Sequence, residues 1–101
     1  MEIRPGVSVD DDALSRFAVG NAVRRLAVFG SVLRHDFGPD SDIDLLVEFE
    51  PGRVPGLLRL AAMELELAAL VGRDVDLRTY GDLSRHFRDE VRAAAHELYA
   101  A

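Results

Sequence analysis

Two aspartates one residue apart, Asp42 and Asp44, are the side chains of this sequence best suited to catalytic chemistry. Residues 42–49 are predicted to form a strand, and residues i and i+2 of a strand point to the same face. Two ionised carboxylates so close together repel each other and raise each other's pKa unless a cation lies between them. A hard divalent ion such as Mg²⁺ takes oxygen ligands and keeps positions for water and phosphate oxygens. The pair therefore predicts a metal site, the alternative being an Asp-x-Asp that only caps a loop at the start of a strand.

A second candidate site is Gly30-Ser31, which follows the short apolar run 26–29, itself predicted to be a buried strand. Glycine lets the backbone approach a ligand closely, and serine offers a hydroxyl group. If a short helix follows, its first N–H groups form an anion site. An isolated Gly-Ser pair is ordinarily a structural turn, so the functional interpretation needs support from its surroundings.

The elements that position these residues follow from hydrophobic periodicity and turn signals. Before Gly30 we expect a helix over 9–23, capped by one of Asp10, Asp11 and Asp12 and burying Leu14, Phe17 and Ala18. Residues 30–34 are expected to form a tight turn leading into a short helix. Residues 37–41 are dense in turn residues and are predicted to be a loop.

Beyond the loop, the strand at 42–49 precedes a long helix over 57–71 that stops at Gly72. A further strand is predicted at 74–79 and a turn at 80–82. One or two helices are expected within 83–99, packed through Leu83, Phe87, Val91, Ala94, Ala95 and Leu98. This order predicts an α/β (α+β) domain whose small mixed sheet of three or more strands packs against helices.

Composition narrows the class of protein. The 101 residues suffice for one domain with one core, and 49% hydrophobic and 30% charged residues are ordinary for a globular protein. There are no cysteines, which excludes disulfides and thiolate metal sites. A net charge of -6 argues against binding DNA or RNA through many phosphate contacts, but not against a metal–nucleotide complex. Neither a signal peptide nor a membrane-length apolar run is recognisable, so we expect a cytoplasmic protein with no membrane partner.

The two candidate sites together form a known pattern. Gly30-Ser31, ten intervening residues and then Asp42-x-Asp44, each half preceded by a strand, resembles the signature of the polymerase-β-like nucleotidyltransferase superfamily. The segments Phe29-Gly30-Ser31-Val32-Leu33-Arg34 and Pro39-Asp40-Ser41-Asp42-Ile43-Asp44-Leu45-Leu46-Val47 resemble the minimal nucleotidyltransferases (MNT), short proteins encoded beside HEPN-domain toxins. The element order and the length extend the resemblance to residues 1–101 as a single domain of this type.

The resemblance implies roles for individual residues. Asp42 and Asp44 would ligate two Mg²⁺ ions (Mn²⁺ being possible) that bridge the triphosphate of ATP, and Gly30 and Ser31 would hold the β- and γ-phosphates. The family's third carboxylate lies on a later strand between hydrophobic residues, a setting that Val75-Asp76-Leu77 matches. Asp76 is accordingly the third expected metal ligand and catalytic carboxylate. Asp74 shares its face by period two and is the competitor, although its place after Gly72-Arg73 is more typical of a turn or cap residue.

Two further residues are candidates for nucleotide binding. Related proteins commonly carry arginine at the position of Arg34, which would either contact a phosphate or pair with Asp36 or Asp40 to fix the loop. Ser41 would either touch the nucleotide or cap the turn. The three histidines, His35, His86 and His96, lack metal-ligand spacing with one another, and His86 and His96 are expected on helix surfaces. The two tyrosines, Tyr80 and Tyr99, are expected in packing or surface roles.

The function that the resemblance implies is transfer of AMP from ATP to an acceptor hydroxyl, with release of pyrophosphate. The minimal members are antitoxins that attach AMP to a tyrosine of their cognate HEPN ribonuclease toxin, and this is the leading hypothesis. Two alternatives remain: an antitoxin that neutralises by binding alone, and a subunit of a small-molecule nucleotidyltransferase of the antibiotic-modifying kind. Fold resemblance does not decide among the three.

Overall fold

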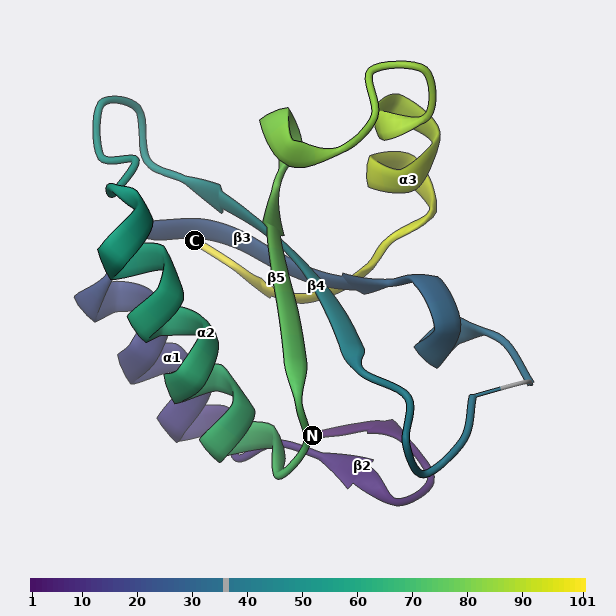
Figure 1. The fold of residues 1–101 in the computed structure, drawn as a ribbon. Coiled ribbons are helices and arrows are strands. Elements are labelled where there is room, and N and C mark those ends of the chain that lie inside the picture. Colours follow the sequence, from purple (N-terminus) through teal and green to yellow (C-terminus); the bar gives the residue numbers. More distant parts are fainter. Residues whose placement is uncertain (36) are drawn as a thin grey trace.

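The computed structural model describes residues 1–35 and 37–101 (Figure 1). Its elements follow in chain order: β1 (Glu2–Arg4), β2 (Val7–Ser8), α1 (Asp11–Gly20), β3 (Val23–Phe29), the 3₁₀ turn η1 (Gly30–Leu33), β4 (Ile43–Phe49), α2 (Leu57–Val71), β5 (Val75–Thr79), the 3₁₀ turn η2 (Tyr80–Asp82), α3 (Arg88–Ala94) and β6 (His96–Ala100). The predicted mixed α and β architecture is confirmed, with a sheet of four strands in the described residues.

The four strands have the order β5-β4-β3-β6. β3 and β4 are antiparallel, as are β3 and β6, whereas β4 and β5 are parallel. A parallel pair needs a long crossover connection, and α2 provides it between β4 and β5. Because β4 and β5 are parallel neighbours, their first residues, Ile43 and Val75, lie at the same end of the sheet.

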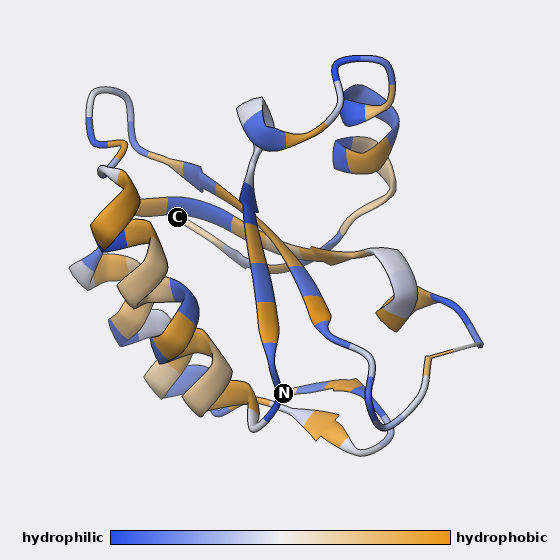
Figure 2. Cartoon of the chain, in the orientation of Figure 1, coloured by the Kyte–Doolittle hydropathy of each residue, from blue (hydrophilic) through white to orange (hydrophobic). Residues whose placement is uncertain are grey.

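The main core lies between one face of the sheet and helices α1 and α2, which lie side by side in Figure 1. Helix residues in this core include Leu14, Phe17, Met63 and Leu67. The strands contribute alternate residues, as period two requires, and Figure 2 shows hydrophobic and hydrophilic bands alternating along β5. In β4 the core residues are Ile43, Leu45 and Val47.

The opposite face of β4 therefore carries Asp44, Leu46 and Glu48. Leu46 is fully buried although it lies outside the main core cluster, so this face is also partly covered. α3 contacts it, since Arg92 forms an ion pair with Glu48 at 2.8 Å. The sheet thus has one face buried by α1 and α2 and a second face that combines polar side chains with the short helix α3.

The expectation of helices throughout residues 83–99 was wrong. Only Arg88–Ala94 is helical, and His96–Ala100 is the edge strand β6. Without β6, one edge of β3 would present unpaired backbone N–H and C=O groups, and pairing with them overrides the helix propensity of an alanine-rich segment. His96 consequently lies in a strand and His86 in the turn before α3, neither on a helix surface.

The expected packing residues of that segment are affected in different ways. Leu98 is buried, but from a strand, whereas Phe87 is 61% exposed. Tyr99 packs against the main core, and the Tyr80 hydroxyl donates a hydrogen bond to Asp89.

At the other end of the chain, the helix predicted over 9–23 ends at Gly20 and β3 begins three residues later. Its start is as expected, because the Asp10 side chain accepts a hydrogen bond from the Ala13 N–H at 2.9 Å. At its end the Asn21 amide donates to the Phe17 carbonyl at 2.8 Å, and Ala22 takes a positive φ of 56°. These two residues turn the chain into the sheet.

The helix predicted over 57–71 has those bounds in the structure, and Gly72 ends it with φ 77°. The antiparallel pair β1–β2 was not expected at all. In the described part of the chain, no helix combines the length and the apolar character that crossing a membrane requires.

Candidate active site

The turn after β3 is built around the carboxylate of Asp44. Gly30 has φ +72°, and a Cβ atom at this residue would lie 2.3 Å from Asp44 Oδ2. The next residue, Ser31, donates a backbone hydrogen bond to Asp44, which acts to lower the pKa of that carboxyl. Both halves of the sequence pattern thus meet at one point, and glycine is required there for two reasons: its backbone conformation and its lack of a side chain.

Asp44 and Asp76 are paired residues on adjacent strands. In the parallel β4–β5 ladder Asp44 lies opposite Asp76, and both belong to the face that does not pack on α1 and α2. Burial raises the pKa of Asp44 above its ordinary value, and the carboxylates of Asp76 and Asp42 raise it further. The site therefore has a concentration of negative charge that a cation would relieve.

Asp42 and Asp74 both come immediately before their strands. Asp42 is exposed, and its strand begins at Ile43, one residue later than predicted. The Ile43 N–H donates to the Asp74 carbonyl at 2.9 Å, so the backbone of Asp74 ties the starts of β4 and β5 together. The register places Asp76, and not Asp74, opposite Asp44.

Asp76 is held by a neighbour on its own strand. Arg78 Nε and Nη2 lie 3.0 and 3.1 Å from Asp76 Oδ1 and Oδ2, a bidentate ion pair. Across residues 1–35 and 37–101, no three acidic or histidine side chains are grouped so as to hold a metal ion. Asp44 and Asp76 share a face of the sheet without forming an assembled chelate.

The donor chemistry nevertheless fits a hard divalent cation. Asp42, Asp44 and Asp76 offer only carboxylate oxygens, the ligands that Mg²⁺ and Mn²⁺ accept. After burial, the nearby carboxylates of Asp76 and Asp42 also act to raise the pKa of Asp44, so negative charge is concentrated beside this carboxyl. The residues present therefore suit the cation that the sequence pattern implies.

The loop that leads to Asp42 is held by Arg73, a residue that the sequence analysis did not single out. Arg73 Nη2 donates to the carbonyls of Gly38 at 2.6 Å and Ser41 at 2.8 Å, and its guanidinium lies 4.4 Å from the centre of the Phe37 ring. Ser41 Oγ accepts a hydrogen bond from the Gly38 N–H at 3.1 Å. The Ser41 hydroxyl thus acts in this structure as a cap within the loop.

Arg4 performs a similar task from the unexpected strand β1. Its Nη1 donates to the carbonyls of Val32 at 3.2 Å and Arg34 at 3.0 Å, at the end of η1. Its guanidinium also contacts the Phe37 ring, 4.6 Å from the ring centre. Arg4 and Arg73 together join the Gly30-Ser31 turn, the following loop and the start of β4. Both contacts span 28 or more residues of sequence, so no local spacing signals them.

Arg34 itself ends η1, where its N–H donates to the Ser31 carbonyl at 2.9 Å. Its exposed side chain helps to line a pocket of about 280 Å³ between the end of β3 and α3. The expected alternative partner Asp36 lies outside the described residues. Arg34 and Gly30 thus line the same pocket.

Strand β5 is fixed from the helix layer. The Leu77 N–H, between Asp76 and Arg78, donates to Glu64 Oε2 of α2 at 2.8 Å. This contact satisfies an edge-strand N–H that has no neighbouring strand. The helix therefore sets the position of the strand that carries Asp76.

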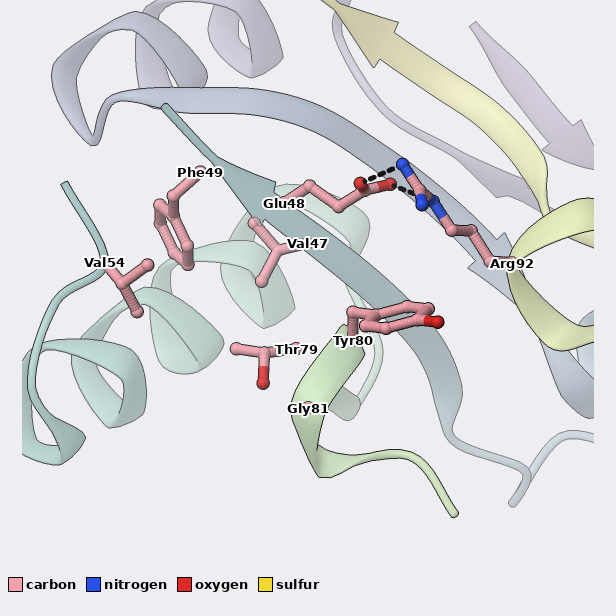
Figure 3. Close-up of a pocket in the computed structure, with 8 residues that line it drawn as sticks. All are labelled: Val47, Glu48, Phe49, Val54, Thr79, Tyr80, Gly81 and Arg92. Atoms are coloured by element: carbon pink, nitrogen blue, oxygen red, sulfur yellow. Dashed lines mark hydrogen bonds and ion pairs between the residues drawn. The ribbon is translucent and has the colours of Figure 1, made fainter. Parts of the chain in front are cut away.

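A separate pocket of about 380 Å³ lies at the other end of β4 (Figure 3). In it Glu48 and Arg92 point toward each other and form an ion pair. Its walls are Val47, Glu48, Phe49, Val54, Thr79, Tyr80, Gly81 and Arg92. None of the candidate metal-binding carboxylates is among them, so this pocket is distinct from the candidate active site.

Comparisons with known proteins identify the family of this chain. A model of the nucleotidyltransferase domain family matches residues 12–98. A Methanocaldococcus jannaschii protein classed as a protein adenylyltransferase is 37% identical over 71 residues, 70% of this chain and 74% of its own. The protein adenylyltransferase MntA of Thermococcus cleftensis is 47% identical over 55 residues, 54% of each chain.

Solved structures show the same fold. A minimal nucleotidyltransferase structure has a TM-score of 0.70 at 38% identity, covering 87% of this chain and 88% of that one. A toxin–antitoxin complex with AMP-PNP gives 0.71 at 19% identity, covering 92% and 75%. An MNT antitoxin complex with the tri-AMPylated HEPN toxin of Shewanella oneidensis gives 0.63 at 19% identity, covering 90% and 70%. With its Gly-Ser turn wrapped around the second aspartate of Asp-x-Asp, this chain belongs to the nucleotidyltransferase domain family, among its minimal members.

Proposed function

We propose that this protein is an adenylyltransferase antitoxin, which transfers AMP from ATP to a tyrosine hydroxyl of a cognate HEPN ribonuclease toxin and so neutralises it. The observation that carries the proposal is the placement of Asp44 opposite Asp76 on parallel strands, beside the Gly30-Ser31 turn. The activity named for the two curated relatives supports the reaction. The AMP-PNP and tri-AMPylated toxin complexes of structural neighbours support ATP and a HEPN protein as the two substrates.

In the proposed reaction the acceptor oxygen forms a bond to the α-phosphorus of ATP. The bond from that phosphorus to the oxygen bridging the α- and β-phosphates breaks, and pyrophosphate leaves with that oxygen. The hydroxyl proton passes to a carboxylate, for which we propose Asp76. There is little covalent work for the protein, so catalysis depends on positioning and on charge neutralisation.

The roles of the residues follow from their positions. Mg²⁺ held by Asp42, Asp44 and Asp76, with Mn²⁺ as a substitute, would supply neutralisation of the triphosphate charge. Gly30 and Ser31 border the second of these aspartates, and we propose that they contact the β- and γ-phosphates. We propose that Arg34 and Ser41 also contribute to nucleotide binding. Ser41 would do so by holding the loop that its hydroxyl caps.

The decisive experiment mixes the purified chain with a candidate cognate HEPN protein, ATP and Mg²⁺ and measures the mass of the HEPN protein. We expect an increase equal to one or more AMP groups on tyrosine. Replacing Asp42→Asn or Asp44→Asn should abolish the adduct while circular dichroism stays that of the wild type. Asp12→Asn, the same change on the exposed first turn of α1, is the matched control and should retain full transfer.

Two outcomes would contradict the proposal. Undiminished transfer in both the Asp42 and the Asp44 variants would remove these carboxylates from the active site. A stable complex that neutralises the toxin and never carries AMP would instead support an antitoxin that acts by binding alone.

A further inference from the structure

Arg78 places a positive charge beside Asp76, a carboxylate that the proposed metal site needs. Its guanidinium forms two parallel hydrogen bonds with Asp76, at 3.0 and 3.1 Å, one to each carboxylate oxygen. Residues 76 and 78 are i and i+2 of β5 and therefore share one face of the sheet. Both oxygens of Asp76 are engaged by the arginine, so a metal ion that binds this carboxylate has to compete with the guanidinium for it.

The charge of Arg78 also acts on the rest of the site. Arg78 opposes the effects of burial, Asp76 and Asp42 on the pKa of Asp44, because it lies close enough to lower it. In return, the hydrogen bonds and charge of Asp76, followed by the charges of Asp82 and Asp44, raise the pKa of Arg78. The guanidinium is thus a counter-ion to two of the candidate metal ligands, Asp76 and Asp44.

The ion pair is one that a stronger ligand can displace. The Arg78 side chain is 47% exposed and that of Asp76 36% exposed, and ion pairs at such surfaces are weak. The strand does not depend on the pair for its position, since Glu64 holds the Leu77 N–H from the helix side. Arg78 is therefore free to change partner without loss of the fold.

We propose that Arg78 exchanges partners: it neutralises Asp76 before ligands arrive, yields that carboxylate to the divalent cation, and then binds the triphosphate. This inference rests on the proposed function. A planar guanidinium suits phosphate oxygens as well as carboxylate oxygens, and the released group starts beside the site where the triphosphate would lie. The exchange makes metal binding weak without nucleotide and stronger with it.

The exchange predicts opposite effects of one substitution on two ligands. In the Arg78→Met variant, Mn²⁺ alone should bind roughly three- to tenfold more tightly, because no guanidinium competes for Asp76. AMP-PNP with Mn²⁺ should bind roughly three- to tenfold more weakly, because a phosphate contact is lost. A purely structural role for Arg78 would shift both affinities in the same direction or neither.

The experiment measures free Mn²⁺ by electron paramagnetic resonance during titration of the whole chain, with and without AMP-PNP, and AMP-PNP affinity by calorimetry. Arg85→Met, which removes the same charge from an exposed residue between η2 and α3, is the matched control and should leave both affinities near those of the wild type. Arg78→Lys keeps the charge and loses the fork, so it should lie between wild type and Arg78→Met. Arg78→Gln provides a second uncharged side chain should the methionine variant fail to fold.

The outcomes separate this inference from the proposed function. If wild type binds Mn²⁺, Asp44→Asn abolishes that binding and the uncharged Arg78 variants bind both ligands as wild type does, the exchange is wrong and the metal site stands. If neither wild type nor any Arg78 variant binds Mn²⁺, both the metal-dependent function and the exchange are overturned. Opposite shifts for Mn²⁺ and AMP-PNP, absent from Arg85→Met, would establish the exchange.

Discussion

Gly30 lies directly against the carboxylate of Asp44: a Cβ atom at residue 30 would lie 2.3 Å from Asp44 Oδ2. The same carboxylate receives a backbone hydrogen bond from Ser31. β3 and β4 are neighbours whose register places Phe29 opposite Asp44, so the turn that leaves β3 must pass over this side chain. The glycine in the sequence pattern is thus explained by the second aspartate.

We expect Gly30→Ala to impair the protein in two ways. Alanine at φ +72° strains the backbone, which should lower the free energy of unfolding by about 1–3 kcal/mol. The new methyl group also forces the Asp44 carboxylate to rotate away. Because displacing a reacting group by about 1 Å can cost on the order of 100-fold in rate, AMP transfer should fall by roughly that factor. Denaturant unfolding and transfer from labelled ATP measure the two effects.

Gly52→Ala separates backbone strain from displacement of the carboxylate. Gly52 has φ +75°, and a Cβ atom there meets nothing within 4 Å. This variant should show a similar loss of stability with transfer close to wild type. Equal transfer by the two variants would show that the contact between Gly30 and Asp44 has no part in catalysis.

Local sequence patterns predicted most of the elements that carry the site. The apolar run before Gly30, the strand after Ser41 and the helix ending at Gly72 all occur, because each is encoded by neighbouring residues. Asp44 lies opposite Asp76 because of the register between β4 and β5, and the sequence alone does not determine that register. Asp76 was predicted as the third carboxylate from the resemblance to the family, and the parallel ladder places it opposite Asp44.

What the sequence did not reveal depends on contacts between distant segments. β6 forms because β3 has an open edge, not because His96–Ala100 has strong strand propensity. Arg4 and Arg73 act by reaching backbone carbonyls on other elements, and no spacing rule identifies such an arginine. Arg78 lies two residues from Asp76, yet its pairing became visible only with the side chains in place.

Ionisation of Asp44 should make the metal-free protein less stable as pH rises. Burial, then Asp76 and Asp42, raises the pKa of Asp44 in the folded protein above 3.8. The folded state therefore binds more protons than the unfolded state between the two pKa values, and the free energy of unfolding decreases with pH across that window. Asp44→Asn lacks this loss. The difference in melting temperature, Asp44→Asn minus wild type, should therefore be more positive at pH 7 than at pH 3.5.

Thermal melts of both proteins in EDTA, from pH 3.5 to pH 7, measure this difference. Adding Mg²⁺ at pH 7 should stabilise wild type and leave Asp44→Asn unchanged, because only the wild type gains a bound ion. Asp12→Asn controls for removal of one negative charge and should show no increase in melting temperature at pH 7. A melting temperature for Asp44→Asn that falls relative to wild type as pH rises would contradict the expected sign.

Arg73→Met tests whether the loop before β4 positions Asp42. The substitution removes hydrogen bonds to the Gly38 and Ser41 carbonyls and the contact with Phe37, which should cost about 1–3 kcal/mol of unfolding free energy. Because the freed loop carries Asp42, the KM for Mg²⁺-ATP should rise roughly tenfold or more, with a smaller change in kcat. Steady-state transfer at varied ATP measures both constants, and Arg53→Met, in the exposed turn after β4, should leave them near wild type. An unchanged KM together with the expected loss of stability would mean that Arg73 holds the loop without influencing the site, because Asp42 would then keep its position through β4 alone.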